Sequence, residues 1–180
     1  MAKFEKVLSQ SKIFWGFALI FVTLGNDKHK FSRLLDQINL LSEQMKDQKF
    51  IVQKGHTDFQ DRKNTFSKRF FDKDTFYKII KEASLIISHA GAGTLFKLVQ
   101  EGKKPIVVPR LSNFDEHLND HQLEIANEFK NRDLCYLINK IENLNVQLVK
   151  KSLNKTSIIK TKKNNKLLMH LSNDFKKYLS

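Results

Sequence analysis

Short apolar runs that alternate with segments of helical spacing constrain the fold of this chain more than any other feature. Ala18–Leu24, Ser84–Ser88 and Pro105–Pro109 are almost wholly apolar, as expected of strands that are covered on both faces. Phe31–Lys46, in contrast, repeats its large apolar residues at helical spacing. Parallel strands need such crossover helices between them. The alternation therefore predicts an α/β fold with a doubly wound parallel sheet.

The rest of the chain continues this alternation within a length of 180 residues, which suits one α/β domain. The single cysteine, Cys135, excludes an intrachain disulfide framework and indicates a reducing compartment. The further strands that we predict are Lys49–Gln53, Leu134–Ile138 and a possible strand at Phe66–Phe71. We predict three further helices. The first is capped by Asp74 and runs to about Ala83, and the other two are Thr94–Glu101 and Asp120–Lys130.

The positive charge is concentrated at the end of the chain. Residues 150–180 contain nine lysines and one acidic residue, Asp174, so that they carry +8 of the net charge of +13. We expect a lead-in at 1–19, a folded domain at 20–149, and a basic linker with an amphipathic helix at 150–180. The linker lacks arginines and interleaved aromatic residues, which disfavours nucleic acid as the partner and favours an anionic surface.

The lead-in contains the apolar run Ile13–Val22, preceded by three lysines. A signal peptide is disfavoured because no small-x-small cleavage site follows, and the run is too short to span a bilayer. Two readings stay open. The run is the entry into the first buried strand, or Ile13, Phe14, Trp15 and Phe17 form a patch for a membrane or a partner.

A glycine-containing turn, Ser84–Thr94 (SLIISHAGAGT), is the strongest local signal of function. A buried strand ends there, two glycines allow a tight turn, and a helix begins. The free N–H groups and the positive end of the helix dipole would suit a phosphate. The glycines do not form a GxGxxG fingerprint, because Phe96 stands at the third position, so a nicotinamide cofactor is not expected.

A second polar segment, Pro109–Ala126, follows a predicted strand, where α/β sheets bind ligands. A solvated loop would have the same composition. A metal site is not expected, because His117 and His121 lack the HExxH arrangement. Asp72-Lys73-Asp74 is a DxD pattern, but its place before a helix favours capping by Asp74.

Together, the two motifs resemble the C-terminal, donor-binding domain of family 28 glycosyltransferases with the GT-B fold. The resemblance runs from about Ile20 to Ile138. The chain is similar to stand-alone members of the family. One group is the catalytic subunits of bacterial capsule and exopolysaccharide transferases, and another is the soluble subunit of the dolichol-pathway N-acetylglucosaminyltransferase. The resemblance implies a Rossmann-like half of a GT-B fold. Lys97 departs from the pattern, since many relatives carry a glutamate there that binds the ribose hydroxyls, and a lysine cannot accept those hydrogen bonds.

The resemblance implies a UDP-sugar as the donor substrate, with no cofactor and no tightly bound metal. The resemblance does not identify the general base. The candidates are His89, Glu116, His117 or a residue of a partner. The residues that it assigns to the donor are Gly25, Gly91, Ala92, Gly93, Thr94, Arg110, Asp120, His121 and Gln122.

The function implied is that of the catalytic subunit of an inverting transferase. It would move a hexose or N-acetylhexosamine to a lipid-linked saccharide acceptor, in polysaccharide or glycolipid biosynthesis. A membrane-anchored subunit would supply the acceptor half, so the chain is expected in the cytoplasm, peripherally attached to a membrane through that partner. The alternative is a non-catalytic nucleotide-sugar-binding or regulatory subunit.

Overall fold

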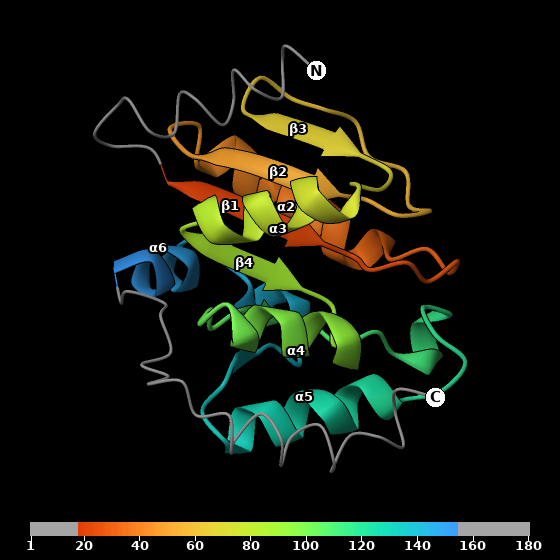
Figure 1. Ribbon diagram of the computed structural model, residues 1–180. Coiled ribbons are helices and arrows are strands. Elements are labelled where there is room, and N and C mark those ends of the chain that lie inside the picture. Colours follow the sequence, from red (N-terminus) through yellow and green to blue (C-terminus); the bar gives the residue numbers. More distant parts are fainter. Residues whose placement is uncertain (1–17, 155–180) are drawn as a thin grey trace.

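The structure, a computed structural model, describes residues 18–154 and contains a six-stranded parallel sheet (Figure 1). Its strands lie in the order β3-β2-β1-β4-β5-β6, so the order reverses between β1 and β4. This confirms the doubly wound sheet that the apolar runs predict. The strands are β1 (Leu19–Thr23), β2 (Lys49–Gln53), β3 (Thr65–Lys68), β4 (Leu85–Ser88), β5 (Ile106–Val107) and β6 (Tyr136–Leu137).

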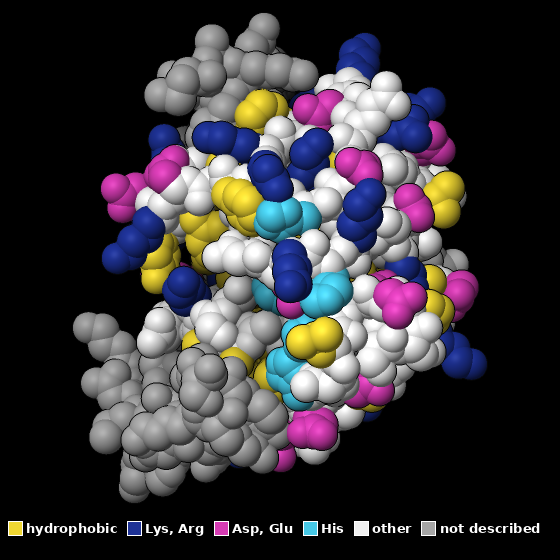
Figure 2. Space-filling view, turned by 90° about the vertical axis from the view of Figure 1, so that its right-hand side faces the viewer, with side chains coloured by type: hydrophobic (Ala, Val, Ile, Leu, Met, Phe, Trp, Pro, Cys, Tyr) yellow, Lys and Arg dark blue, Asp and Glu magenta, His cyan; other side chains and the backbone are white. Residues whose placement is uncertain are grey.

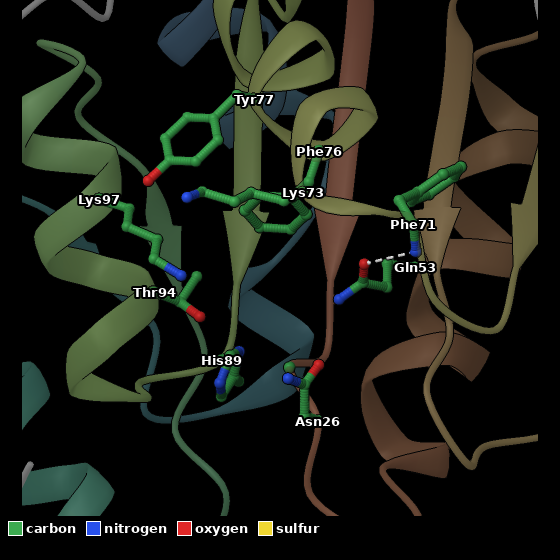
Figure 3. Close-up of a pocket in the computed structure, with 10 residues that line it drawn as sticks. Asn26, Gln53, Phe71, Lys73, Phe76, Tyr77, His89, Thr94 and Lys97 are labelled. Atoms are coloured by element: carbon green, nitrogen blue, oxygen red, sulfur yellow. Dashed lines mark hydrogen bonds between the residues drawn. The ribbon is translucent and has the colours of Figure 1, made fainter.

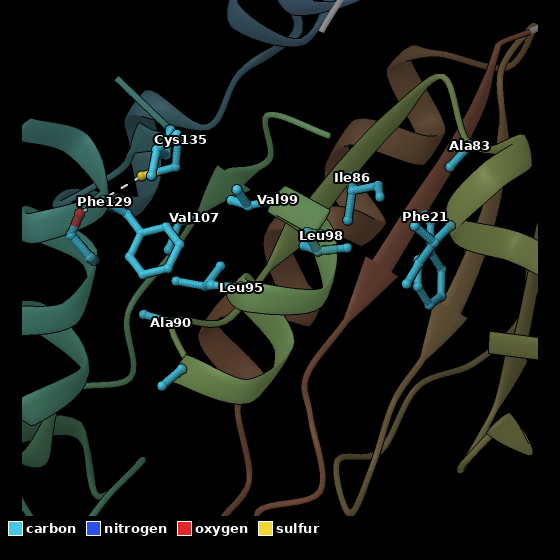
Figure 4. Packing of buried hydrophobic residues seen from close by; sticks show 14 of the residues in the cluster. Phe21, Ala83, Ile86, Ala90, Leu95, Leu98, Val99, Val107, Phe129 and Cys135 are labelled. Carbon is cyan, nitrogen blue, oxygen red and sulfur yellow. Dashed lines mark hydrogen bonds between the residues drawn. The ribbon is translucent and has the colours of Figure 1, made fainter. Parts of the chain in front are cut away.

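Helices cover both faces of this sheet, and the alternation of side chains along β1 shows how (Figure 1). Leu19 and Phe21 pack in one core cluster with α3, α4 and α5, whereas Ile20 and Val22 pack in a second cluster with α2 and α6. Figure 4 shows the first cluster, where Leu95 and Phe129 meet between α4 and α5. The helices are α2 (Ser32–Gln44), α3 (Lys73–Glu82), α4 (Ala92–Gln100), α5 (His121–Asn131) and α6 (Val146–Asn154), with short 3-10 turns η1 (Ser112–Phe114) and η2 (Ile141–Asn143).

Three local predictions differ from the structure. Asp72, not Asp74, is the N-cap of α3, because its backbone is extended and its Oδ1 accepts a hydrogen bond from the Thr75 N–H at 2.9 Å. Helix α4 begins at Ala92, two residues earlier than predicted. The predicted linker at 150 begins within α6, whose Ser152 is buried against the domain.

The lead-in patch at 13–17 and the amphipathic helix predicted after Asn154 lie outside the described residues. Within residues 18–154, no helix combines the length and the apolar character needed to cross a membrane.

Candidate functional site

A pocket of about 280 Å³ opens where β1, β2 and β4 end, between α3 and the first turn of α4 (Figure 3). Lys73 reaches toward it from α3, and Thr94 and Lys97 do so from α4. Gly25, His89 and Thr94 were predicted to lie in the site, and the structure brings these three together. The full lining is Gly25, Asn26, Gln53, Phe71, Lys73, Phe76, Tyr77, His89, Thr94 and Lys97.

The first turn of α4 borders this pocket through Thr94, whereas Gly91, Ala92 and Gly93, also predicted to bind the donor, are not among its lining residues. Its N-cap, Gly91, has extended backbone and supplies no side-chain cap, while its carbonyl accepts hydrogen bonds from the Thr94 and Leu95 N–H groups. The N–H groups of Ala92 and Gly93 precede these and have no acceptor within a helical ladder. They therefore remain available to an anion beside the Thr94 hydroxyl.

His89 lies between two glycines, at the base of the pocket. A methyl group on Gly25 or on Gly91 would overlap the His89 Nε2 atom. The Nδ1 atom lies 3.3 Å from the Thr23 carbonyl oxygen, so Nδ1 carries the proton and Nε2 presents a lone pair. Burial and the charge of Arg110 lower the pKa of His89 to about 4, which keeps the ring neutral at neutral pH.

Gln122 holds the glycine turn in place from the start of α5. Its Oε1 accepts hydrogen bonds from the Ala90 and Arg110 N–H groups, both at 3.2 Å, and the side chain is buried. The resemblance assigns Gln122 to the sugar hydroxyls. In the structure its oxygen is shared between two backbone donors, so Gln122 positions the turn, and its binding to a sugar through the amide NH2 stays a prediction.

Arg110, also assigned to the donor, is 1% exposed and does not line the pocket. Its guanidinium donates to the carbonyl oxygens of Leu24, His29 and Glu116 at 3.0, 2.9 and 3.1 Å. It also lies over the Phe31 ring, 4.7 Å from the centroid. Arg110 thereby ties the loop after β1 to the loop after β5. Burial lowers its pKa against the opposing effect of Asp27 and Glu116.

Glu116, a candidate base, forms a buried ion pair. Its Oε1 and Oε2 accept hydrogen bonds from Arg33 on α2 at 2.9 and 2.7 Å, and Oε2 also accepts from the Leu111 N–H at 3.1 Å. A proton acceptor needs an oxygen facing the acceptor substrate, and both oxygens here hold other groups. This geometry gives Glu116 a structural role.

Histidines gather on one face of the molecule, with Lys and Arg side chains around them (Figure 2). Asp27 lies among them, with Oδ1 at 2.7 Å from His29 Nδ1 and Oδ2 at 3.4 Å from His117 Nε2. The His117 and His121 rings meet edge to face with centroids 4.4 Å apart. Sequence reasoning missed Asp27 and His29. The signal that would have found them is an acidic residue and a histidine two positions apart, just after the first strand.

Burial and the neighbouring His121 lower the pKa of His117. Its Nδ1 accepts a hydrogen bond from the Asn119 N–H at 3.4 Å, which leaves the proton of the neutral ring on Nε2, facing Asp27. Asp120 closes the same loop by accepting from the Ser112 N–H at 2.7 Å, and His121 contacts Asn119 Oδ1. In the part of the chain that the structure describes, no three potential ligand side chains are grouped to hold a metal ion.

Known proteins resemble this chain in sequence and in fold. A family model described as the glycosyltransferase family 28 C-terminal domain matches residues 19–177. A UDP-N-acetylglucosamine–N-acetylmuramyl-(pentapeptide) pyrophosphoryl-undecaprenol N-acetylglucosamine transferase of Borreliella burgdorferi is 29% identical over 116 residues, which are 64% of this chain and 29% of the relative. The human UDP-N-acetylglucosamine transferase subunit ALG13 is 39% identical over 56 residues, 31% of this chain and 5% of that protein.

The fold is similar to that of a solved glycosyltransferase, SnogD from Streptomyces nogalater. The TM-score is 0.61 at 15% sequence identity, and the likeness covers 93% of this chain and 42% of that one. Less than half of SnogD, and less than a third of each curated relative, is thus matched by this chain.

Proposed function

Because the chain belongs to the family of glycosyltransferase family 28 C-terminal domains, we propose that it is the catalytic subunit of an inverting, UDP-sugar-dependent transferase. It would move a hexose or N-acetylhexosamine to a lipid-linked saccharide acceptor, in polysaccharide or glycolipid biosynthesis. The names of the Borreliella and human relatives, both UDP-N-acetylglucosamine transferases or subunits of one, support the donor class.

The main support for the proposal is the positive charge of the pocket and its position at the start of α4. Its lining contains Lys73 and Lys97 and no carboxylate, and neither ammonium takes part in an ion pair among residues 18–154. The uncapped first turn of α4 adds N–H donors and a partial positive charge at the same place. A diphosphate has the charge and the acceptor oxygens to satisfy all of these groups.

In the proposed reaction the acceptor hydroxyl loses its proton to a base, and its oxygen bonds to the anomeric carbon. The bond from that carbon to the diphosphate oxygen breaks, and UDP leaves with the electron pair. The α4 amides, Thr94 and the two lysines would stabilise the charge that develops on the leaving diphosphate. Lys97, which cannot accept hydrogen bonds from a ribose, has a role in this scheme as a cation.

We further propose that a membrane-anchored partner supplies the acceptor half of the site and holds this chain at the cytoplasmic face of a membrane. The support is the name of a relative. The human relative of this chain is itself called a subunit of a UDP-N-acetylglucosamine transferase.

Calorimetric titration of the full-length chain with UDP, UMP and uridine tests the nucleotide site. We expect UDP to bind most tightly, and Lys97→Gln to weaken UDP binding by about tenfold while changing uridine binding little. Lys130→Gln, which removes an exposed charge on α5, is the matched control. Equal affinity for UDP and uridine, or no binding of either, would contradict the proposal.

The alternative is a regulatory subunit that binds nucleotide sugars without catalysis. It is favoured by Lys97, which departs from the family pattern, and by the match of this sequence to a single domain of the family. Transfer assays decide between the two. Membranes from source cells that lack this chain would supply partner and acceptor, and the purified chain would be added back with a labelled UDP-sugar. Transfer that depends on side chains of this chain beyond those that bind UDP would exclude the regulatory role.

A further inference from the structure

Four histidines lie around the carboxyl ends of β1, β4 and β5. They differ in how their two ring nitrogens are hydrogen-bonded. His89 is buried, with a pKa of about 4, which makes it a weak base. His117 holds its proton toward Asp27 and uses its other nitrogen as an acceptor for Asn119. His89 and His117 therefore offer no unengaged, basic lone pair. His121 contacts Asn119 Oδ1, an amide oxygen that carries no charge to stabilise a protonated ring.

His29 differs from the others. Its Nδ1 lies 2.7 Å from Asp27 Oδ1, and an ionised carboxylate can only accept, so the ring proton is on Nδ1. The Nε2 lone pair is therefore directed away from Asp27, and the side chain is 27% exposed. A carboxylate that fixes the tautomer of an imidazole and stabilises its protonated form is the arrangement that activates a general base.

The pair is held rigidly in place. The His29 N–H donates to Asp27 Oδ1 at 2.8 Å, which closes a tight turn, and the buried Arg110 donates to the His29 carbonyl at 2.9 Å. Burial of Asp27 opposes its ionisation, but hydrogen bonds from His29 and the charges of Arg110 and His117 outweigh this and lower its pKa. Asp27 is thus a carboxylate at neutral pH.

The pair also borders the donor pocket. Gly25 and Asn26, the two residues before Asp27, line that pocket, and the charge of Asp27 reaches His89 inside it. An acceptor hydroxyl that approaches a sugar held beside α4 would enter on this side, between the loops after β1 and β5.

We propose that His29 is the general base of the transfer and that Asp27 is the residue that positions it. This inference rests on the proposed function. The proton of the acceptor hydroxyl passes to His29 Nε2 as its oxygen bonds to the anomeric carbon, and UDP departs with the electrons of the broken bond. The imidazolium, balanced by Asp27, then releases its proton to water.

Nitrogen-15 NMR of the labelled full-length chain tests the pair without any reaction. His29 should be the Nδ1–H tautomer when neutral, and Asp27→Asn should redistribute the proton between the two nitrogens, since an amide at 27 can offer a donor as well as an acceptor. An Nε2–H tautomer in the wild-type chain would overturn the proposal, because no lone pair would then face the acceptor.

The add-back transfer assay tests the base itself. His29→Gln should lower kcat by about 10²- to 10⁴-fold, with the Kd for UDP unchanged, while His56→Gln, outside the cluster, keeps wild-type kcat.

The outcomes separate the two proposals. If His29→Gln retains more than about a third of wild-type kcat, His29 is not the base, and the proposed transferase function stands. If the wild-type chain binds no UDP and transfers no sugar, the proposed function fails, and the base fails with it.

Discussion

His89 and the two glycines around it show how closely the turn before α4 is packed. Gly91→Ala would place a methyl group against His89 Nε2, and the ring cannot retreat because Gly25 lies on its other side. We expect the free energy of unfolding to fall by about 1–3 kcal/mol, as for other overpacked sites. Urea denaturation of the full-length chain measures this.

Gly93 gives the matched control, because a methyl group there would meet no atom within 4 Å. Gly93 is helical, so Gly93→Ala should raise the free energy of unfolding by about 0.5 kcal/mol through its helix propensity. Equal effects of the two substitutions would mean that His89 does not confine the turn.

At this scale the sequence predicts backbone roles better than side-chain roles. The positions of Gly25, Gly91 and Thr94 could be predicted because a strand, a turn and a helix follow one another along the chain. Arg110 and Gln122 have the chemistry of ligand-binding residues, yet their partners are backbone groups of other loops, as far as 86 residues away in sequence. Polar residues that bind ligands and polar residues that hold loops have the same composition.

Between elements, the ion pair of Arg33 and Glu116 joins α2 to the loop after β5. The two side chains are 14% and 4% exposed, and Arg33 also donates to the Pro109 carbonyl at 3.0 Å. Arg33→Ala should leave Glu116 buried without its partner and lower the free energy of unfolding by about 3 kcal/mol. Thermal or urea unfolding of the variant measures the loss.

Arg62 and Glu43 form a comparable pair at 2.7 Å, but their side chains are 43% and 47% exposed. Arg62→Ala should therefore cost no more than about 1 kcal/mol, because water screens the pair. Similar losses in Arg33→Ala and Arg62→Ala would refute a special role for the buried pair.

Elements that are apolar enough to be covered on both faces were predictable, and the marginal ones were not. β2 coincides with the predicted Lys49–Gln53. β3, at the sheet edge, has only one of its four residues buried and was placed one to three residues too late. The start of α3 depends on which of two aspartates, Asp72 or Asp74, adopts extended backbone, and composition does not distinguish them.

For the molecule as a whole, the reversal of strand order between β1 and β4 determines where the site is. The loops after β1 and β4 diverge there, as in other doubly wound sheets, and the pocket and the histidine cluster both lie at this edge. Alternating runs predict a sheet of this kind. They do not predict that Asp27 would meet His117, because that contact joins loops from separate strands, 90 residues apart in sequence.

Burial of a neutral His89 also makes the stability of the whole fold depend on pH. The unfolded chain takes up a proton near the ordinary pKa of 6.5, whereas folded His89 does so only near 4, so acid favours unfolding between these values. The free energy of unfolding should fall by about 2 kcal/mol from pH 7 to pH 5, measured by urea denaturation at each pH. The lowered pKa of His117 acts in the same direction, and His89→Gln should therefore remove most, but not all, of this dependence on pH. His56→Gln should leave it unchanged. An undiminished slope in His89→Gln would show that His89 is not held neutral in the folded chain.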